Sequence, residues 1–472
     1  MFNRAICLLG LFGGLLLVAP SPAWTAEQAT KTKPNLVILL ADDLGYADVG
    51  FHGSKIRTPH IDSLAKDGAR LERFYSCPMC SPTRAGLMTG RWPLRMGIMR
   101  AVIPPWRDYG LPESEHTLAE MLAEAGYRHR AVIGKWHLGH AHRRHHPLNH
   151  GFTHFYGHYN GAIDYFTHER EGEVDWHRDH ETVLEEGYST DLLGSEAARF
   201  IDGVPKGEPY FLYLPFNAPH SPFQAKQEEL ARYAGRRGNR KTLAAMIDSL
   251  DQAVGKVLGA IERRGDAHNT FVLFFSDNGG VRTVADNSPL RGSKLTPYEG
   301  GIRVVAAARY PAGGVVGGKV SEQRMGYIDV YPTLKHLAGG EGEAPNPLDG
   351  RDVLDAMAGR EALSDRPWFT YEAQSGDGGE RLAVNTDGWK LVVHGPSVLD
   401  ESKAAAETRR IELFRIDRDP HEKNDMAAEH ADRVAALLAQ AREFRRWQVP
   451  GVAAYAAGRE GFTAPPKWRL PD

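Results

Sequence analysis

A short cysteine motif stands where a helix is predicted to begin. The run Cys80-Ser81-Pro82-Thr83-Arg84 is followed by apolar and small residues as far as Gly90. Ser81 is a residue type that caps helix N-termini and Pro82 suits the first turn, so we predict a helix that stops at Gly90. Helix N-termini attract anions, and an arginine one turn further can reach the same place. Cys80 and Arg84 therefore indicate a nucleophile that faces a phosphate or sulfate group.

Acidic and amide residues follow two apolar runs of the chain. Asp42 and Asp43 come directly after one run, and Asp277 and Asn278 come directly after another. Three carboxylates at one place are costly unless a cation neutralises them, and such oxygen ligands suit calcium or magnesium. Solvated loop acids are the alternative for either segment taken alone. The two segments together predict a divalent metal site.

Basic side chains stand at or near other predicted strand ends. A sulfate ester held on a metal needs donors for its other oxygens, assistance for the nucleophile and a proton source for the leaving alcohol. A single lysine or histidine is more often a solvated surface residue, or a core residue with its hydrogen bonds made. Five basic residues are nevertheless candidates because they stand at or near predicted strand ends. The set is Arg84, Lys135, His137, His220 and Lys294.

The elements that would position these residues alternate between strands and helices. Apolar runs of strand length are typical of a buried parallel sheet, and amphipathic segments between them are typical of covering helices. The predicted strands are 36–41, 131–134, 210–214 and 270–275, and the predicted helices are 118–125 and about 243–261. Ligands of α/β sheets bind beyond the carboxyl ends of the strands, so we expect the polar residues to meet there.

The last part of the chain has a different pattern of predicted elements. Short alternating segments at 381–393 and 411–416 precede a helix at about 427–446 and a proline-rich tail. We predict a catalytic domain over 27–340 and a C-terminal subdomain over 341–472, built from a smaller antiparallel sheet and a helix.

The first 26 residues have the pattern of a signal peptide. A basic start is followed by an apolar stretch at 5–19 and by small residues. We therefore predict export to the periplasm or the medium, with an uncleaved anchor as the alternative. No later stretch predicts a membrane span, and a formal net charge of -3 argues against a nucleic-acid partner.

Two cysteines remain once Cys7 leaves with this segment. Cys77 and Cys80 are too few for a disulfide framework. Their C-x-x-C spacing leaves a redox motif or half of a zinc site as alternatives, although redox chemistry does not explain the P-x-R extension.

The mature chain resembles the formylglycine-dependent (type I) sulfatases over nearly its whole length. The run 80–84 is similar to their C-x-P-x-R signature, whose cysteine is oxidised to an aldehyde residue. Ordered similarities continue at 35–45, 134–139, 217–220, 276–280, 291–303 and 412–425. The chain departs from the family in its extra Cys77 and in Val304-Val305, where the family usually carries a proline.

This resemblance implies an alkaline-phosphatase-like α/β fold, with a mixed, mostly parallel sheet between helices, and the hydrolysis of sulfate monoesters. It implies that a formylglycine-generating enzyme converts Cys80 to 3-oxoalanine, whose hydrate attacks sulfur and later expels sulfate through its second hydroxyl. By the same resemblance Ca²⁺, or Mg²⁺, is held by Asp42, Asp43, Cys80, Asp277 and Asn278. Arg84 stabilises the hydrate, His137 acts as a base, and Lys135, His220 and Lys294 bind sulfate, the last two nearest the leaving oxygen.

Segments 90–97 and 164–169 resemble the arylsulfatase B (N-acetylgalactosamine-4-sulfatase) branch. That likeness implies a sulfated saccharide as substrate, with aryl sulfates as surrogates and with sugar contacts from Asp164, His168 and Trp106. The alternatives are a phosphomonoester or phosphonate ester hydrolase of the same superfamily, and an unmatured protein that only binds sulfated glycans.

The segment 128–158 is rich in histidine. We predict a solvated basic loop at the mouth of the pocket, which would attract polyanionic sugars, and keep a zinc site as the alternative. Its histidines are His140, His142, His145, His146, His150, His154 and His158.

Overall fold

A ten-stranded sheet whose five adjacent central strands run parallel forms the centre of the fold. This computed structural model describes residues 1 and 32–471, so the predicted signal peptide lies outside the described residues except for Met1. The central strands, in spatial order, are β11 (Thr270–Ser276), β1 (Asn35–Ala41), β10 (Tyr210–Pro215), β4 (His129–Lys135) and β5 (His154–His158). One edge carries β13 (Ala306–Arg309), β2 (Ala69–Leu71) and β14 (Lys319–Ser321), and the other carries β8 (His177–Arg178) and β9 (Glu181–Thr182).

Antiparallel neighbours occur only toward the two edges of this sheet, among the residues described. β13 runs antiparallel to both β11 and β2, and β8 runs antiparallel to both β5 and β9. The predicted mixed, mostly parallel α/β sheet is confirmed.

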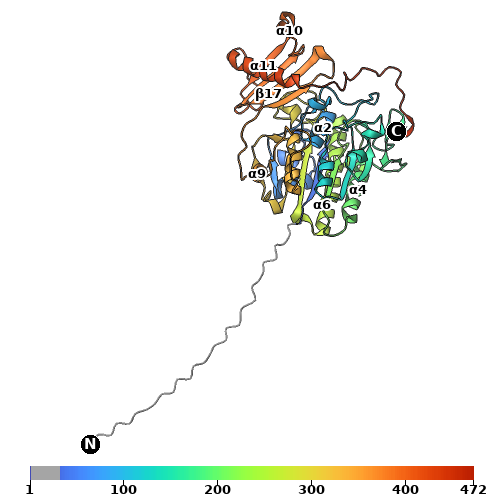
Figure 1. Ribbon diagram of the computed structural model, residues 1–472. Helices are drawn as coiled ribbons and strands as arrows, with labels where there is room; N and C mark the ends of the chain where they lie inside the picture. Colours follow the sequence, from blue (N-terminus) through green and yellow to red (C-terminus); the bar gives the residue numbers. More distant parts are fainter. Residues whose placement is uncertain (2–31, 472) are drawn as a thin grey trace. The chain divides into compact units, whose positions relative to one another are not determined.

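Helices cover both faces of the sheet because its central strands are apolar on both sides. Alternate residues of β1 face two separate hydrophobic cores, with Leu36 in one and Val37 in the other. The first core includes side chains of α2 (Cys80–Thr89), α3 (Leu118–Glu124) and α8 (Val330–Ala338). The second includes those of α1 (Pro59–Asp67), α4 (Ser189–Gly203) and α6 (Gly238–Arg264), and Figure 1 shows α4 and α6 in the same part of the fold.

A second, four-stranded sheet is antiparallel throughout and carries a helix, as predicted. Its order is β16 (Trp368–Glu372), β17 (Glu380–Thr386), β18 (Trp389–Gly395) and β19 (Arg410–Phe414). Helix α11 (Ala431–Arg446) packs on β17 and β18 and begins four residues later than predicted (Figure 1). The division at residue 340 remains a prediction.

Shorter elements complete the described chain. They are β3 (Phe74–Tyr75), β6 (Glu169–Arg170), β7 (Glu173–Val174), α5 (Gln227–Arg232), α7 (Glu299–Ile302), β12 (Arg303–Val304), β15 (Met325–Gly326), α9 (Leu354–Met357) and α10 (Lys403–Thr408). Within residues 32–471, no helix combines the length and the apolar character that crossing a bilayer requires.

A buried ion-pair cluster links the C-terminal sheet to helix α7. Lys390 of β18 contacts Glu299 of α7 at 2.8 Å and Glu422 at 2.8 Å, and the side chains of all three residues are fully buried or nearly so. Because each charge lacks water, each depends on the others. The cluster therefore fixes the C-terminal sheet beside the segment that leads into α7.

We expect Lys390→Met to lower the free energy of unfolding by about 3–5 kcal/mol, since two carboxylates would stay buried without their cation. Denaturant unfolding would measure this. Lys403→Met, at a lysine whose side chain is 89% exposed, is the matched control and should change little. A loss below about 1 kcal/mol in the Lys390 variant would show that the cluster is not needed for stability.

Candidate active site

Four adjacent parallel strands bring several of the predicted site residues together at the carboxyl ends of the strands. Asp42 follows β1 and Asp277 follows β11, and the register pairs Ala41 with Ser276, so the two carboxylates are neighbours. Lys135 is the last residue of β4. His220 follows β10, which lies between β1 and β4.

Helix α2 begins at Cys80, two residues earlier than a cap at Ser81 predicts. Its N-cap is Met79 in an extended conformation, and Gly90 ends it with a φ of 68°. Ser81 does not cap the helix, because its hydroxyl accepts a hydrogen bond from the backbone N–H of Ile103 at 3.1 Å. That tertiary contact is what the sequence could not indicate. Cys80 consequently lies in the first turn.

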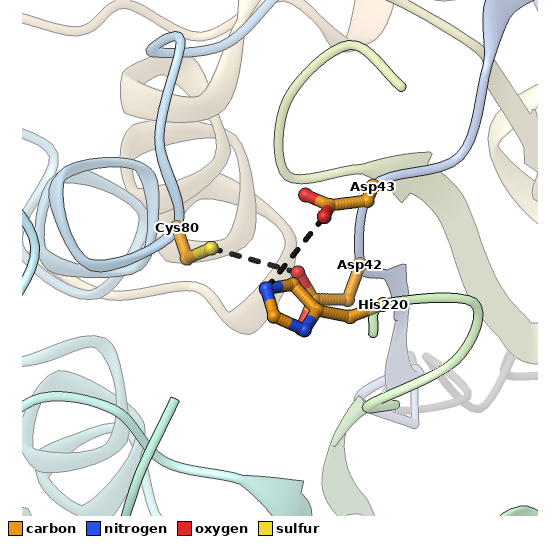
Figure 2. Close-up of side chains that lie close together, drawn as sticks. All are labelled: Asp42, Asp43, Cys80 and His220. Carbon is orange, nitrogen blue, oxygen red and sulfur yellow. Dashed lines mark hydrogen bonds and ion pairs between the residues drawn. The ribbon is translucent and has the colours of Figure 1, made fainter. Parts of the chain in front are cut away.

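The Cys80 thiol points into a cluster of charged side chains. Its Sγ lies 3.5 Å from Oδ1 of Asp42 and 3.5 Å from Nζ of Lys294. Figure 2 shows the thiol directed toward Asp42, and the His220 ring beside Asp43, whose carboxylate lies 3.6 Å from Nε2 of His220. The cysteine predicted to be modified thus lies against the predicted metal ligands.

Each buried carboxylate at the carboxyl ends of these strands is paired with a cationic side chain. Arg84 donates to Oδ2 of Asp277 from Nη2 at 2.7 Å and from Nε at 3.2 Å. Lys294 contacts Asp43 at 2.6 Å. The third pair joins Lys135 to Asp42, and both side chains are fully buried.

The pKa values of these groups reflect burial and close charges. Burial raises the pKa of Asp277 to about 6, and the neighbouring Asp42 carboxylate adds to the rise. Burial would also raise the pKa of Asp43, but Lys294 and His220 lower it to about 2. Burial raises the pKa of the Cys80 thiol to about 12, so the unmodified thiol is protonated near neutral pH.

Asn278 has a feature that fits a metal ligand. Its Nδ2 donates to Oδ1 of Asp43 at 2.7 Å and to the carbonyl oxygen of Gly279, while its own Oδ1 is buried without any partner. A buried unpaired oxygen is costly, and a cation would satisfy it. Ligand atoms of Asp42, Asp43, Cys80 and His220 also lie within 4.8 Å of one another. The donor set therefore fits a hard divalent cation.

His137 presents one unpaired ring nitrogen. Its Nε2 lies 3.0 Å from the carbonyl oxygen of Ile103, which only a protonated nitrogen can approach as a donor. Its Nδ1 is buried without a partner. Burial and the nearby Lys135 charge lower the pKa of this imidazole well below its usual value. Nδ1 is therefore a lone-pair acceptor.

A cavity of about 410 Å³ opens above the charged cluster. Small-ligand sites commonly have roughly 300–1,000 Å³. Of the predicted residues, Cys80, His137, His220 and Lys294 line it. The lining residues that sequence reasoning missed include three from remote segments, because nothing in the local pattern of a two-residue strand, a strand end or a proline-rich tail marks them. They are Arg170, Gln374 and Tyr455.

The residues predicted to contact sugar have other partners. Asp164 accepts hydrogen bonds from the backbone of Phe166 and Thr167, and His168 is buried with its ring stacked on Trp176. Trp106 donates from its indole nitrogen to the Tyr455 carbonyl oxygen at 2.9 Å. None of the three is among the residues that line the cavity.

The prediction of a solvated basic loop at 128–158 is wrong for five of its seven named histidines, although Arg143 and Arg144 are exposed. His140, His145, His146, His150 and His158 are each at most 4% exposed. Burial lowers the pKa of His146 to about 3 and that of His150 to about 4, so these rings are neutral and contribute no basic charge. Among the described residues, the one His, Cys, Asp or Glu cluster compact enough for a metal is that at Asp42, so the zinc alternative gains no support.

Comparisons with known proteins give a consistent result. The sequence profile of one family, described as Sulfatase, matches residues 34–340. Arylsulfatase J of Mus musculus is 32% identical over 90% of this chain and 78% of its own length. N-acetylgalactosamine-6-sulfatase of Mus musculus is 31% identical over 95% of this chain and 91% of its own length.

A solved structure, Ps i-CgsB in complex with k-i-k-neocarrahexaose, aligns with a TM-score of 0.81 and 32% identity, covering 90% of this chain and 95% of that chain. A phosphonate monoester hydrolase of Agrobacterium radiobacter aligns with a TM-score of 0.60 at 19% identity, over 88% of this chain and 95% of that chain, which shows a shared fold alone.

The buried histidines predict a loss of stability in mild acid. Histidine in an unfolded chain has a pKa near 6.5, whereas His146 and His150 in the folded chain have values of about 3 and 4. Between pH 6.5 and pH 4 the unfolded chain binds more protons, so the free energy of unfolding falls as pH falls, by up to about 1.4 kcal/mol per pH unit for each such histidine.

Denaturant unfolding at pH 7, 6 and 5 would measure this slope. His150→Gln should reduce it, and His268→Gln, at an exposed histidine, should leave it unchanged. Identical slopes in the wild type and the His150 variant would contradict the expectation.

Proposed function

Because the chain belongs to the sulfatase family and hydrolyses sulfate esters, we propose that its natural substrates are sulfated saccharides, with aryl sulfates as surrogates. The proposed mechanism depends mainly on one observation. An open cavity lies above three carboxylates that are paired with three cations, and Cys80 lies among these charged groups. The relative that is named an N-acetylgalactosamine-6-sulfatase and the structure bound to neocarrahexaose support a saccharide. The arylsulfatase B branch remains a prediction.

The proposed metal ligands are Asp42, Asp43, Asp277 and Asn278, together with residue 80. The unpaired Oδ1 of Asn278 and the close carboxylates support this set, and their hardness favours Ca²⁺. A bound cation would withdraw electrons from the sulfate group and stabilise the negative charge that develops on its oxygens.

We propose that Cys80 is converted to formylglycine, whose hydrated aldehyde supplies the nucleophile. The raised pKa of the buried thiol supports this, because a protonated thiol is a poor nucleophile. Cys77 is buried behind the site, with its Sγ 3.1 Å from the Tyr327 hydroxyl, and does not line the cavity. The two cysteines are free thiols in the structure.

The cations have a second role in this proposal. Three carboxylates and three cations balance here, so a divalent ion at Asp42 and Asp43 would leave Lys135 and Lys294 with charge for the sulfate oxygens. Arg84 holds Asp277 in place and also donates to the Lys135 carbonyl oxygen at 2.8 Å, so it keeps both sides of the site in register.

Proton transfer is assigned to residues at the cavity wall. His137 Nδ1, the unpaired acceptor, takes a proton from the hydrate. His220 and Lys294 are the candidate donors to the leaving alcohol oxygen. The carbonyl oxygen of Ser221 lies 2.5 Å from Nδ1 of His220, so Nδ1 carries the proton of the neutral ring, and Nε2, on the side of Asp43, must gain a proton before it can donate one.

Location and maturation belong to the same proposal. The pattern of residues 1–26 supports export to the periplasm or the medium. Formylglycine at residue 80 requires a formylglycine-generating enzyme in the host.

We expect a higher rate of hydrolysis for an aryl sulfate than for the matched aryl phosphate. We also expect Cys80→Ala to lower kcat on the aryl sulfate by roughly 10⁴-fold or more, since the nucleophile is lost. Cys77→Ser is the matched control and should retain activity. Mass spectrometry of the tryptic peptide 74–84 should show formylglycine at residue 80. A dominant phosphatase rate would favour the phosphoester alternative, and an unmodified Cys80 in inactive protein would favour the glycan-binding one.

We expect Ca²⁺ to raise the Tm of the chelator-treated protein, because binding to the folded state alone stabilises it. Asn278→Ala should weaken calcium binding at least about tenfold in calorimetry, and Asn278→Asp should restore it in part. Asn424→Ala, at an exposed asparagine, is the control. Equal affinities in wild type and Asn278→Ala would remove Asn278 from the ligand set.

A further inference from the structure

The wall of the active-site cavity carries one cation more than the proposed mechanism uses. Among the described residues that line it, none is Asp or Glu, and Lys294, His220 and His137 already have roles in sulfate binding or proton transfer in the proposed mechanism. Arg170 lines the same cavity and has no role there. Because no acidic side chain lines this wall among the described residues, its cationic side chains are suited to an anionic ligand.

The backbone at Arg170 is held on two sides. Strands β6 and β7 form a short hairpin in which Arg170 pairs with Glu173. From the other side, the indole nitrogen of Trp468 donates to the Arg170 carbonyl oxygen at 3.0 Å, and Trp468 is only 1% exposed. The guanidinium therefore starts from a fixed main chain.

The Arg170 side chain is only partly satisfied within the protein. Its Nε is buried and has no hydrogen-bond partner. Its Nη2 lies 3.4 Å from Oε1 of Glu171, whose side chain is 35% exposed and so is screened by water. A guanidinium has five N–H donors in a planar fork that matches a carboxylate or a sulfate. The donors on the exposed part of this side chain, which is 24% exposed, are available to a ligand.

A neighbouring side chain offers a neutral surface for a sugar ring. Tyr455 lines the same cavity, its backbone N–H donates to the Gln374 carbonyl oxygen at 3.0 Å, and its ring packs edge-on against Trp106 at 5.1 Å. The aromatic ring is thus held in place by two segments far from it in sequence. Arg170 and Tyr455 provide a charge and an apolar face beyond the scissile group.

We propose that Arg170 binds a second anionic group, a sulfate or a carboxylate, on the saccharide that carries the scissile sulfate. This inference rests on the proposed function and makes it narrower, because it selects saccharides with at least two negative charges. Arg170 is a specificity residue in this proposal, and the cleavage step itself does not depend on it.

The test compares kcat and KM on four substrates. They are an aryl sulfate, a saccharide whose only charge is the scissile sulfate, the same saccharide with a second sulfate, and the same saccharide with a carboxylate. Arg170→Ala should lower kcat/KM about 10- to 100-fold on a doubly charged saccharide, mainly through KM, as expected for the loss of a charge-assisted hydrogen bond. The first two substrates should change by less than about twofold.

Two further variants keep the result interpretable. Arg170→Lys retains the charge but not the fork and should lose less than Arg170→Ala. Arg446→Ala removes a positive charge from a side chain that is 61% exposed on α11, and should affect no substrate. The larger loss, on the second sulfate or on the carboxylate, identifies which anion Arg170 binds.

Equal losses on all four substrates, or a loss on none, would overturn the proposal. Tm values measured for each variant detect misfolding, and Arg170→Lys then provides the comparison if Arg170→Ala is unstable. A wild-type protein that cleaves aryl sulfate but no saccharide would contradict the proposed substrate class rather than the role of Arg170.

Discussion

The site depends on one constraint, the burial of three carboxylates at the carboxyl ends of the central strands. Asp42, Asp43 and Asp277 give up water, so each must have a cation close by. The three cations come from a strand, a helix and a loop, and no single element could satisfy the charges alone. The strand order β11-β1-β10-β4 and the start of α2 at Cys80 are therefore parts of one electrostatic arrangement.

In the proposed mechanism, the same cations serve both a metal and an anion. In the protein alone they neutralise carboxylates, and a divalent ion bound to those carboxylates would leave surplus positive charge facing the cavity. A sulfate ester would neutralise part of that surplus. Arg84 is fully buried and donates both to Asp277 and to the Lys135 carbonyl oxygen, so it differs from the two lysines in holding two segments of the site together.

The sequence predicted those parts of the fold and site that depend on local pattern. Continuous apolar runs followed by polar or charged residues identified β1, β4, β10 and β11 within a few residues. Amphipathic spacing identified helices α3 and α6 in the same way. Tertiary partners decided the rest. Ser81 accepts from the distant Ile103 N–H and so caps nothing, and His146 is buried with its Nε2 2.8 Å from the carbonyl oxygen of Asp179. Histidine count alone does not distinguish a solvated loop from such a neutral, packed one.

Different segments of the chain form the floor and the outer wall of the cavity. Its floor is set by strand ends and α2, whereas its outer wall comes from the β6–β7 hairpin, the segment after β16 and the C-terminal tail at Tyr455. None of the three carboxylate–cation pairs involves a residue of these outer segments. Changes in the hairpin or the tail can therefore alter what fits the outer cavity without altering the charged floor.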